Sequence, residues 1–180
     1  MNTLVLGGAR SGKSGAAERL VRAMGGQPTY IATATAGDDE MRERIERHRR
    51  DRGPGWRLVE EPLDLPGAIR AALSASLGPV LVDCLTLWLS NLVLAGRSVE
   101  GGTAELLAAL ADVSPVVLVS NEVGMGLVPD TPLGRRFRDE QGRLNQAVAA
   151  AVPHVLFVAA GLTLALKAPP SPSPSGRGLG

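Results

Sequence analysis

The stretch "GGARSGKS", residues 7–14, decides the fold class of this chain. It fits the pattern G-x-x-x-x-G-K-[ST]; the short apolar run "TLVLG" (3–7) leads into it, and an alanine-rich segment follows it. Such a loop between a strand and a helix lets backbone N–H groups surround phosphate oxygens at the positive end of the helix. In this pattern Lys13 reaches the outer phosphates and the hydroxyl of Ser14 holds Mg²⁺. The stretch therefore predicts a nucleotide-binding P-loop.

The rest of the chain alternates apolar, strand-like runs with helical segments. Further strands are expected at 29–34, in "WRLVEEP" (56–62), and at 79–84, 115–122 and 154–161. Helices are expected from Lys13, at 38–50, 69–77 and 134–151, and from the end of the 79–84 strand to about Asp112 with an interruption at "GRSVEGG" (96–102). Apolar strands separated by helices are typical of an α/β fold with a mostly parallel sheet that helices cover on both faces.

The length and the C-terminal composition bound the domain organisation. At 180 residues the chain is long enough for one domain of ordinary size. We expect a single nucleotide-binding catalytic domain over residues 1–167. The remainder, 168–180, alternates proline and serine without core-forming residues and is expected to be a disordered tail.

Composition excludes several classes of partner. The formal net charge is +1 and aromatic residues make up 3% of the chain, which argues against a surface for nucleic acid. The longest strongly apolar run, residues 85–95, is about half of the roughly 20 residues that a membrane span needs. The first residues lack the pattern of a signal peptide, and a single cysteine, Cys84, excludes an internal disulfide. We therefore expect a cytoplasmic protein without a membrane span.

Two acidic residues follow apolar strands. A P-loop enzyme needs a carboxylate near its metal ion, and Asp83 closes the run "VLVD". The alternative is that Asp83 only caps the next helix. Glu122, which ends "VLVSNE", is a second candidate. Ligands of open α/β sheets bind beyond the carboxyl ends of the strands, so both acids are expected to face the site.

The arginine-rich stretch "RERIERHRRDR" (42–52) contains His48. Met41, Ile45 and His48 fall at helical spacing on one face, so His48 could simply complete a packed stripe. Alternatively, the surrounding arginines disfavour the imidazolium form, and a neutral imidazole can attack phosphorus while arginines hold the displaced phosphates. The residues alone leave both interpretations open.

Four motifs together resemble one enzyme family. "GGARSGKS", "YIATATAGDDEMRERIERHRRDR", "DCLTLWLSNL" and "NEVGMGLVPDTPLGRRFRDEQGRLNQ" are similar, in this order, to the bifunctional adenosylcobinamide kinases / adenosylcobinamide-phosphate guanylyltransferases of cobalamin synthesis. The resemblance covers about residues 2–167. It implies a RecA-like P-loop fold, phosphorylation of adenosylcobinamide by ATP or GTP, and transfer of GMP from GTP to the product. It also implies a homotrimer with sites between subunits.

The resemblance implies roles for particular residues. The histidine of the pattern E-M-x-x-R-I-x-x-H, here His48, is the residue that carries GMP as a covalent intermediate. Lys13 is the other catalytic residue, and Ser14 and Asp83 are the expected Mg²⁺ ligands. The residues expected to bind the nucleotide are Gly7, Gly8, Ala9, Arg10, Ser11, Gly12, Lys13, Ser14, Ala32, Thr33, Ala34, Arg49, Arg50, Asp51, Arg52, Glu60 and Asp83.

Two other functions compete with this one. A P-loop kinase of another small metabolite would use the same loop without a covalent intermediate. A RecA-like nucleotide-driven binding protein would need a basic, aromatic surface for its partner, which this composition does not offer.

Overall fold

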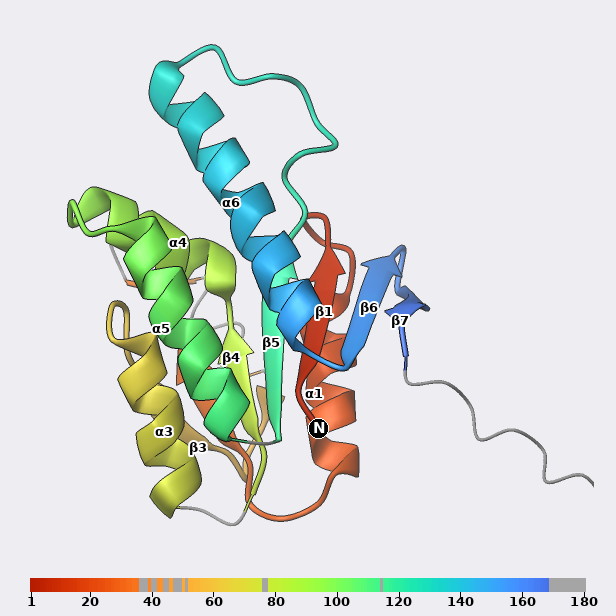
Figure 1. Cartoon of the computed structure of the whole chain (residues 1–180). Helices are drawn as coiled ribbons and strands as arrows, with labels where there is room; N and C mark the ends of the chain where they lie inside the picture. The colour runs from red at the N-terminus through yellow and green to blue at the C-terminus, as the bar shows by residue number, and fades with distance from the viewer. Residues whose placement is uncertain are drawn as a thin grey trace, which may run out of the picture.

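The computed structural model describes residues 1–35, 39, 42–43, 46, 50, 52–75, 78–113 and 115–168. They form three layers, in which a sheet lies between helices on its two faces (Figure 1). Within the described residues the sheet has seven strands in the order β3-β2-β4-β5-β1-β6-β7. The predicted α/β class, with a mostly parallel sheet covered on both faces, is confirmed.

The strands are short, and four adjacent inner strands are largely buried. Their bounds are β1 (Thr3–Gly7), β2 (Thr29–Ala32), β3 (Arg57–Glu60), β4 (Val80–Asp83), β5 (Val116–Asn121), β6 (His154–Ala159) and β7 (Leu162–Lys167). All pairs are parallel except β6–β7, which is antiparallel. The carboxyl ends of β1, β2, β4 and β5 therefore lie at the same edge of the sheet.

The helices divide unequally between the two faces. On one face, α1 (Lys13–Ala23) packs against a cluster that includes Val5, Leu81 and Val119. The other face is covered by α3 (Leu65–Ala75), α4 (Leu85–Leu94), α5 (Val99–Asp112) and α6 (Pro132–Ala151). Leucine and valine supply most of this larger core, with Trp88 as its largest side chain. Aliphatic side chains thus fill most of a core that contains few aromatic residues.

Four elements differ from the sequence-based expectation. Helix α3, expected at 69–77, starts four residues earlier, at Leu65, just after Asp64, whose side chain accepts a hydrogen bond from Gly67 N at 3.1 Å. The interruption between α4 and α5 is shorter than "GRSVEGG", because Ser98 caps α5 by accepting a hydrogen bond from Gly101 N at 3.0 Å and so starts the helix at Val99. The last helix starts two residues early, at Pro132, where Thr131 is the cap. Strand β7 was not predicted; a turn with positive φ at Ala160 and Gly161 reverses the chain and adds it to the sheet edge.

Two further predictions fall largely on residues that the structure does not describe, and a third concerns a membrane span. Most of the expected 38–50 helix lies outside them, although Arg42, Glu43 and Glu46 are helical and exposed. Residues 169–180 of the expected tail also lie outside. In the part of the chain that the structure describes, no helix is both long enough and apolar enough to cross a bilayer.

Candidate nucleotide site at the carboxyl edge of the sheet

The P-loop occupies the turn between β1 and α1, as the motif predicted. Lys13 is the first residue of α1 and is buried, with 9% of its surface exposed. Its Nζ donates to the carbonyl of Gly8 at 3.1 Å, so the ammonium group lies across the loop. Ser14 follows it and is half-buried. A buried cation on a loop at a helix N-terminus is the arrangement that binds phosphate.

The loop is shaped by glycines and by the β6–β7 turn. A Cβ on Gly7 would lie 2.5 Å from both Ser11 Oγ and the carbonyl oxygen of Val158, so only glycine fits there. Gly12 has a φ of 91°, which favours glycine, and its backbone lies against Gly161. Gly161 N donates to the carbonyl of Ser11 at 2.8 Å. The hairpin therefore supports the loop from the side of β6.

Ser11 shows how the loop fits a phosphate group. Its Oγ is buried and has no hydrogen-bond partner among the described residues. A buried hydroxyl without a partner is costly, and an anion held by the loop would supply an acceptor. Among the described residues, the Ser11 hydroxyl is therefore not used to hold the loop by a hydrogen bond.

Asp83 ends β4 and lies two strand positions from β1, roughly 10 Å away across the sheet. Its register partner on β5 is Val119, and that of Gly7 is Asn121. The nearby Thr33 holds this strand end, because its hydroxyl donates to Cys84 O at 2.7 Å and accepts from Cys84 N at 2.9 Å. The side chain of Thr33, expected to bind nucleotide, thus holds the backbone beside Asp83.

Tyr30 reaches Asp83 from the neighbouring strand. Its hydroxyl donates to Asp83 Oδ2 at 3.1 Å, and the residue is 5% exposed. Burial, followed by the negative charge of Asp83, raises the pKa of Tyr30 far above its ordinary value, so the phenol keeps its proton and remains a donor. Burial, followed by the negative charge of Asp83, also raises the pKa of the Cys84 thiol to about 11.

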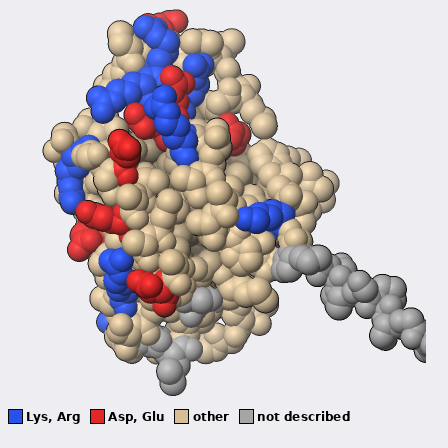
Figure 2. Space-filling view, viewed as in Figure 1, with Lys and Arg blue, Asp and Glu red and all other residues tan. Residues whose placement is uncertain are grey.

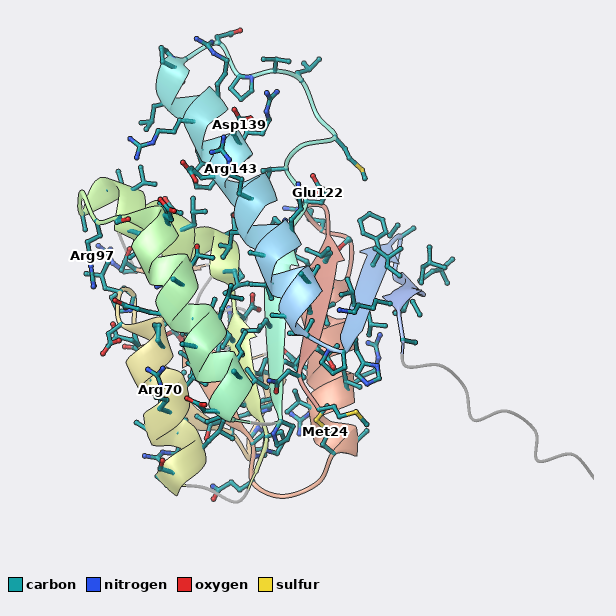
Figure 3. All side chains as sticks on the ribbon, viewed as in Figure 1. Met24, Arg70, Arg97, Glu122, Asp139 and Arg143 are labelled. Carbon is teal, nitrogen blue, oxygen red and sulfur yellow. The ribbon has the colours of Figure 1, made fainter. Side chains whose placement is uncertain are left out.

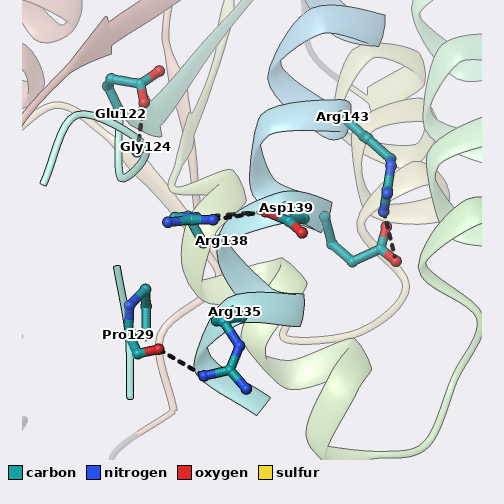
Figure 4. A network of polar contacts seen from close by, with 8 residues as sticks. Glu122, Gly124, Pro129, Arg135, Arg138, Asp139 and Arg143 are labelled. Atoms are coloured by element: carbon teal, nitrogen blue, oxygen red, sulfur yellow. Dashed lines mark hydrogen bonds and ion pairs between the residues drawn. The ribbon is translucent and has the colours of Figure 1, made fainter. Parts of the chain in front are cut away.

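The end of β5 lies directly beside the start of the P-loop. Glu122 N donates to the carbonyl of Gly7 at 3.1 Å, and Figure 3 shows Glu122 next to the upper end of β1. Asn121 is held from two sides, since its N–H donates to Thr86 Oγ1 at 2.9 Å and its carbonyl accepts from Asn145 Nδ2 at 3.0 Å. Glu122 Oε1 accepts from Gly124 N at 2.6 Å, so this second acid stabilises its own turn (Figure 4).

The charged first half of α6 extends beyond this edge of the sheet. Arg135 donates to the carbonyls of Pro129 and Asp130, and Arg138 and Arg143 pair with Asp139 and Glu140, respectively (Figure 4). Figure 2 shows blue and red side chains mixed over the upper part of the molecule. Mixed charge of this kind differs from the continuous basic surface of a nucleic-acid binder.

The remaining predicted site residues are only partly brought together. Ala32 ends β2 level with Asp83, and Ala34 follows two residues later, so both lie at the site edge. Glu60 ends the outer strand β3 and is exposed. Ala9, Arg10 and Arg50 are exposed, whereas Arg52 is buried against the ring of Tyr30. His48, Arg49 and Asp51 lie outside the described residues.

The donor set fits Mg²⁺ bound together with a nucleotide. Mg²⁺ is typically held by one or two protein oxygens while phosphates and water complete its shell. Ser14 and Asp83 offer a hydroxyl and a carboxylate at the same edge, and one oxygen of that carboxylate is already fixed by Tyr30. The described residues contain no group of three or more histidine, cysteine, aspartate or glutamate side chains placed to form an all-protein cage.

Three residues at this edge of the sheet, Tyr30, Asn121 and Gly161, were not predicted from the sequence. Tyr30 is the only tyrosine in the chain, and it lies in an apolar strand. Because a buried phenol needs a polar partner, its position in that strand could have predicted a hydrogen bond near the site. Gly161 and Asn121 gave no comparable signal. Their roles depend on which strands lie side by side in the folded sheet, and the sequence does not give that order.

Comparison with solved structures supports the fold. The chain is similar to a prototypical ATPase from the type III secretion system of pathogenic bacteria, with a TM-score of 0.55, 12% identity, and coverage of 91% of this chain and 56% of that one. It is also similar to the ATPase EscN of enteropathogenic E. coli, with a TM-score of 0.57, 10% identity, and coverage of 88% and 43%. This chain spans about half the length of those ATPases, and the likeness concerns the P-loop fold alone.

Comparison with curated proteins supports a particular enzyme family in addition to the fold. The chain is 48% identical over 173 residues to the bifunctional adenosylcobalamin biosynthesis protein CobP of Pseudomonas aeruginosa, covering 94% of this chain and 99% of the relative. It is 40% identical over 183 residues to the bifunctional adenosylcobalamin biosynthesis protein CobU of Escherichia coli, covering 93% and 100%. Residues 3–166 match the family described as cobinamide kinase / cobinamide phosphate guanyltransferase. The chain belongs to this cobinamide kinase / cobinamide phosphate guanyltransferase family.

Proposed function

We propose that this chain catalyses two successive reactions of cobalamin biosynthesis at the site beyond β1, β4 and β5. In the first, the aminopropanol hydroxyl of adenosylcobinamide attacks the γ-phosphorus of ATP or GTP, and the nucleoside diphosphate leaves. In the second, GMP passes from GTP to the new phosphate, giving adenosylcobinamide-GDP and pyrophosphate. The observation that carries this proposal is a complete P-loop, with buried Lys13 lying across it, in a member of this family.

The chain's own residues divide the work of phosphate binding. The loop from Gly7 to Ser14 binds the phosphates of the nucleotide through backbone N–H groups, and Lys13 neutralises charge that develops on the outer phosphates during transfer. Asp83 and Ser14 would hold Mg²⁺, which supplies positive charge between the phosphates. Ala32 to Ala34, Glu60, Arg50 and Arg52 are proposed to line the nucleotide site, as are Arg49 and Asp51.

The second reaction is proposed to pass through His48. A ring nitrogen of neutral His48 attacks the α-phosphorus of GTP, a P–N bond forms, and pyrophosphate leaves. A phosphate oxygen of adenosylcobinamide phosphate then attacks the same phosphorus, the P–N bond breaks, and free His48 returns. This route divides the transfer into two displacements, each with a good leaving group.

We also propose a cytoplasmic homotrimer with sites between subunits. An apolar loop supports the assembly, because Met125, Leu127 and Val128 are 81%, 96% and 62% exposed between β5 and α6. Exposed apolar side chains in one short segment commonly mark a protein interface. Sedimentation equilibrium that returns the mass of one chain would contradict the trimer.

Lys13→Ala tests the site assignment for both reactions. Loss of the ammonium group removes a charge-assisted contact with the transferred phosphates, and removal of one such group typically lowers the rate about 10²–10³-fold. We expect a loss of this size in both the kinase and the guanylyltransferase assay, with thermal unfolding still cooperative.

The chain's other lysine provides a matched control. Lys167 donates to the carbonyls of Ala149 and Ala150 at the end of α6, so Lys167→Ala should change stability slightly and leave both rates near those of wild type. A folded Lys13→Ala protein with wild-type rates contradicts the assignment.

A further inference from the structure

A compact cluster of aromatic and arginine side chains lies beneath the end of β4. Tyr30 occupies its centre: the Arg52 guanidinium carbon lies 3.6 Å from the centroid of its ring, and Trp56 meets it edge-on at 5.9 Å between centroids. Arg52 is 8% exposed, and its carbonyl accepts a 2.6 Å hydrogen bond from Arg22 Nη2. The Arg22 guanidinium carbon in turn lies 5.3 Å from the centroid of the Trp56 ring.

This packing fixes the direction of the tyrosine hydroxyl. A ring with a cation over one face and a second ring packed perpendicular to it has little rotational freedom. Cation–π contacts also strengthen when they are buried. Tyr30 lies on β2 opposite Leu81, and Asp83 is two residues further along β4 on the same face of the sheet. The hydroxyl therefore reaches diagonally along the face and donates to one oxygen of the Asp83 carboxylate, Oδ2, at 3.1 Å.

This contact makes the two carboxylate oxygens of Asp83 inequivalent. One oxygen is occupied by the phenol, so the rotation of the carboxylate is fixed and the other oxygen is left to interact with the metal–nucleotide complex. Residues that orient a ligating carboxylate contribute strongly to metal binding although they do not touch the metal. The cluster also connects this carboxylate to Arg52, which comes four residues after His48 in the chain.

We infer that Tyr30 is a positioning residue: its hydroxyl orients Asp83 for the Mg²⁺-dependent reactions, and Arg52 holds its ring in place. This inference rests on the proposed role of Asp83. It assigns Arg52 to the support of the site, through Tyr30, in addition to any contact with nucleotide.

The test compares Mg²⁺ titrations of kinase activity in wild type, Tyr30→Phe, Asp83→Asn and the double variant. Tyr30→Phe keeps the ring and its stacking but loses the hydroxyl. We expect it to raise the Mg²⁺ concentration for half-maximal activity about 10-fold, the size expected for one hydrogen bond to a charged group. The dissociation constant of GTP measured in EDTA should stay within about twofold of wild type, because the P-loop is unchanged.

A readout independent of turnover uses Mn²⁺ as the probe. Paramagnetic resonance of Mn²⁺ added with GDP counts the bound ion, and its dissociation constant should rise in Tyr30→Phe by about the same factor as the Mg²⁺ requirement. Thr29→Val is the matched control. It removes a buried hydroxyl from the same strand, one that has no hydrogen-bond partner among the described residues, and should leave both titrations unchanged.

The double variant and Arg52→Lys complete the test. Because the hydroxyl acts through the carboxylate, Tyr30→Phe should add nothing to Asp83→Asn. Arg52→Lys keeps the charge but loses the flat guanidinium that stacks on the ring, so it should shift the Mn²⁺ titration in the same direction and by less.

The outcomes separate failure of the inference from failure of the proposed function. If Asp83→Asn leaves the metal titrations unchanged, the proposed metal role of Asp83 is wrong. If Asp83→Asn shifts them and Tyr30→Phe does not, the inference about Tyr30 is overturned while the proposed function stands. A lower melting temperature of Tyr30→Phe without a metal shift, or effects that add in the double variant, would also overturn it. An unchanged Mn²⁺ titration in Arg52→Lys removes Arg52 from the inference.

Discussion

At the scale of single residues, hydroxyl groups hold the end of β4. Thr33 bonds both the N–H and the carbonyl of Cys84, and Tyr30 bonds the carboxylate of Asp83. Asn91 Nδ2 donates to the carbonyl of Thr33 at 2.8 Å and so ties this group to α4. Asp83 therefore sits on a strand end whose backbone and side chain are both fixed by neighbours, which suits its proposed contact with a metal–nucleotide complex.

We expect Thr33→Val to destabilise the protein by about 1–3 kcal/mol, because valine has the same shape and leaves the N–H and carbonyl of Cys84 without their partner. Chemical denaturation measures this change in the free energy of unfolding. Thr29→Val is again the control, since the hydroxyl it removes has no partner among the described residues and its loss should cost little.

Thr33→Val also tests whether the Thr33 hydroxyl contributes to nucleotide binding. If its hydroxyl only holds the strand end, affinity for GTP in EDTA should stay close to wild type in Thr33→Val. A large loss of GTP affinity without a loss of stability would contradict this purely structural role and show that the Thr33 hydroxyl contacts the nucleotide directly.

At the scale of elements, the β6–β7 hairpin supports the P-loop. Its turn brings the N–H of Gly161 to the carbonyl of Ser11, and the backbone of Gly161 lies against Gly12. Gly161 has a φ of 80°, a conformation that costs roughly 1–2 kcal/mol for a residue with a side chain. A change in the backbone conformation of this turn should therefore also change the conformation of the phosphate-binding loop.

We expect Gly161→Ala to lower affinity for GTP about 5- to 10-fold, because relief of the strain weakens the bond to Ser11 and loosens the loop. Isothermal titration calorimetry measures the affinity. Gly96→Ala is a matched control: Gly96 has a φ of 65° after α4, and a Cβ there meets nothing within 4 Å. Equal losses of affinity in both variants would show that general destabilisation, not the hairpin, is responsible.

The elements also show what the sequence could predict. Buried strands such as β1, β4 and β5 were predictable because apolar β-branched runs between helices have few alternatives, and the P-loop motif located the site at the end of β1. Strand β7 was missed because its leucines are exposed, so its place depends on pairing with β6 rather than on burial of its own side chains. The early start of α5 was missed because the capping hydroxyl of Ser98 outweighed a glycine pair.

At the scale of the whole molecule, the order of the strands brings the motifs together. β5 lies between β1 and β4, so the P-loop, Asp83 and Glu122 share one edge although they are far apart in the sequence. That P-loop and those strand-end acids were predictable from the motifs. The contacts of Tyr30 with Asp83 and of Gly161 with Ser11 were not, because each joins segments whose neighbourhood only the folded sheet creates.

The most direct test of the proposed function is covalent labelling of the protein by GTP that is labelled at the α-phosphate. After incubation with Mg²⁺ and denaturing electrophoresis, the wild-type chain should retain the label, and His48→Ala should lose it while still binding GTP, because the nucleophile is gone and the P-loop is intact. His154→Ala, which changes the chain's other histidine at the start of β6, should label like wild type.

The chemistry of the adduct completes this measurement. A phosphoramidate on histidine should be labile in acid and stable in base, and GTP labelled at the γ-phosphate should leave no label because pyrophosphate departs. These results are what the guanylyl-histidine route predicts. A His48→Ala protein that still takes up α-label, or a wild-type adduct that survives acid, would contradict it.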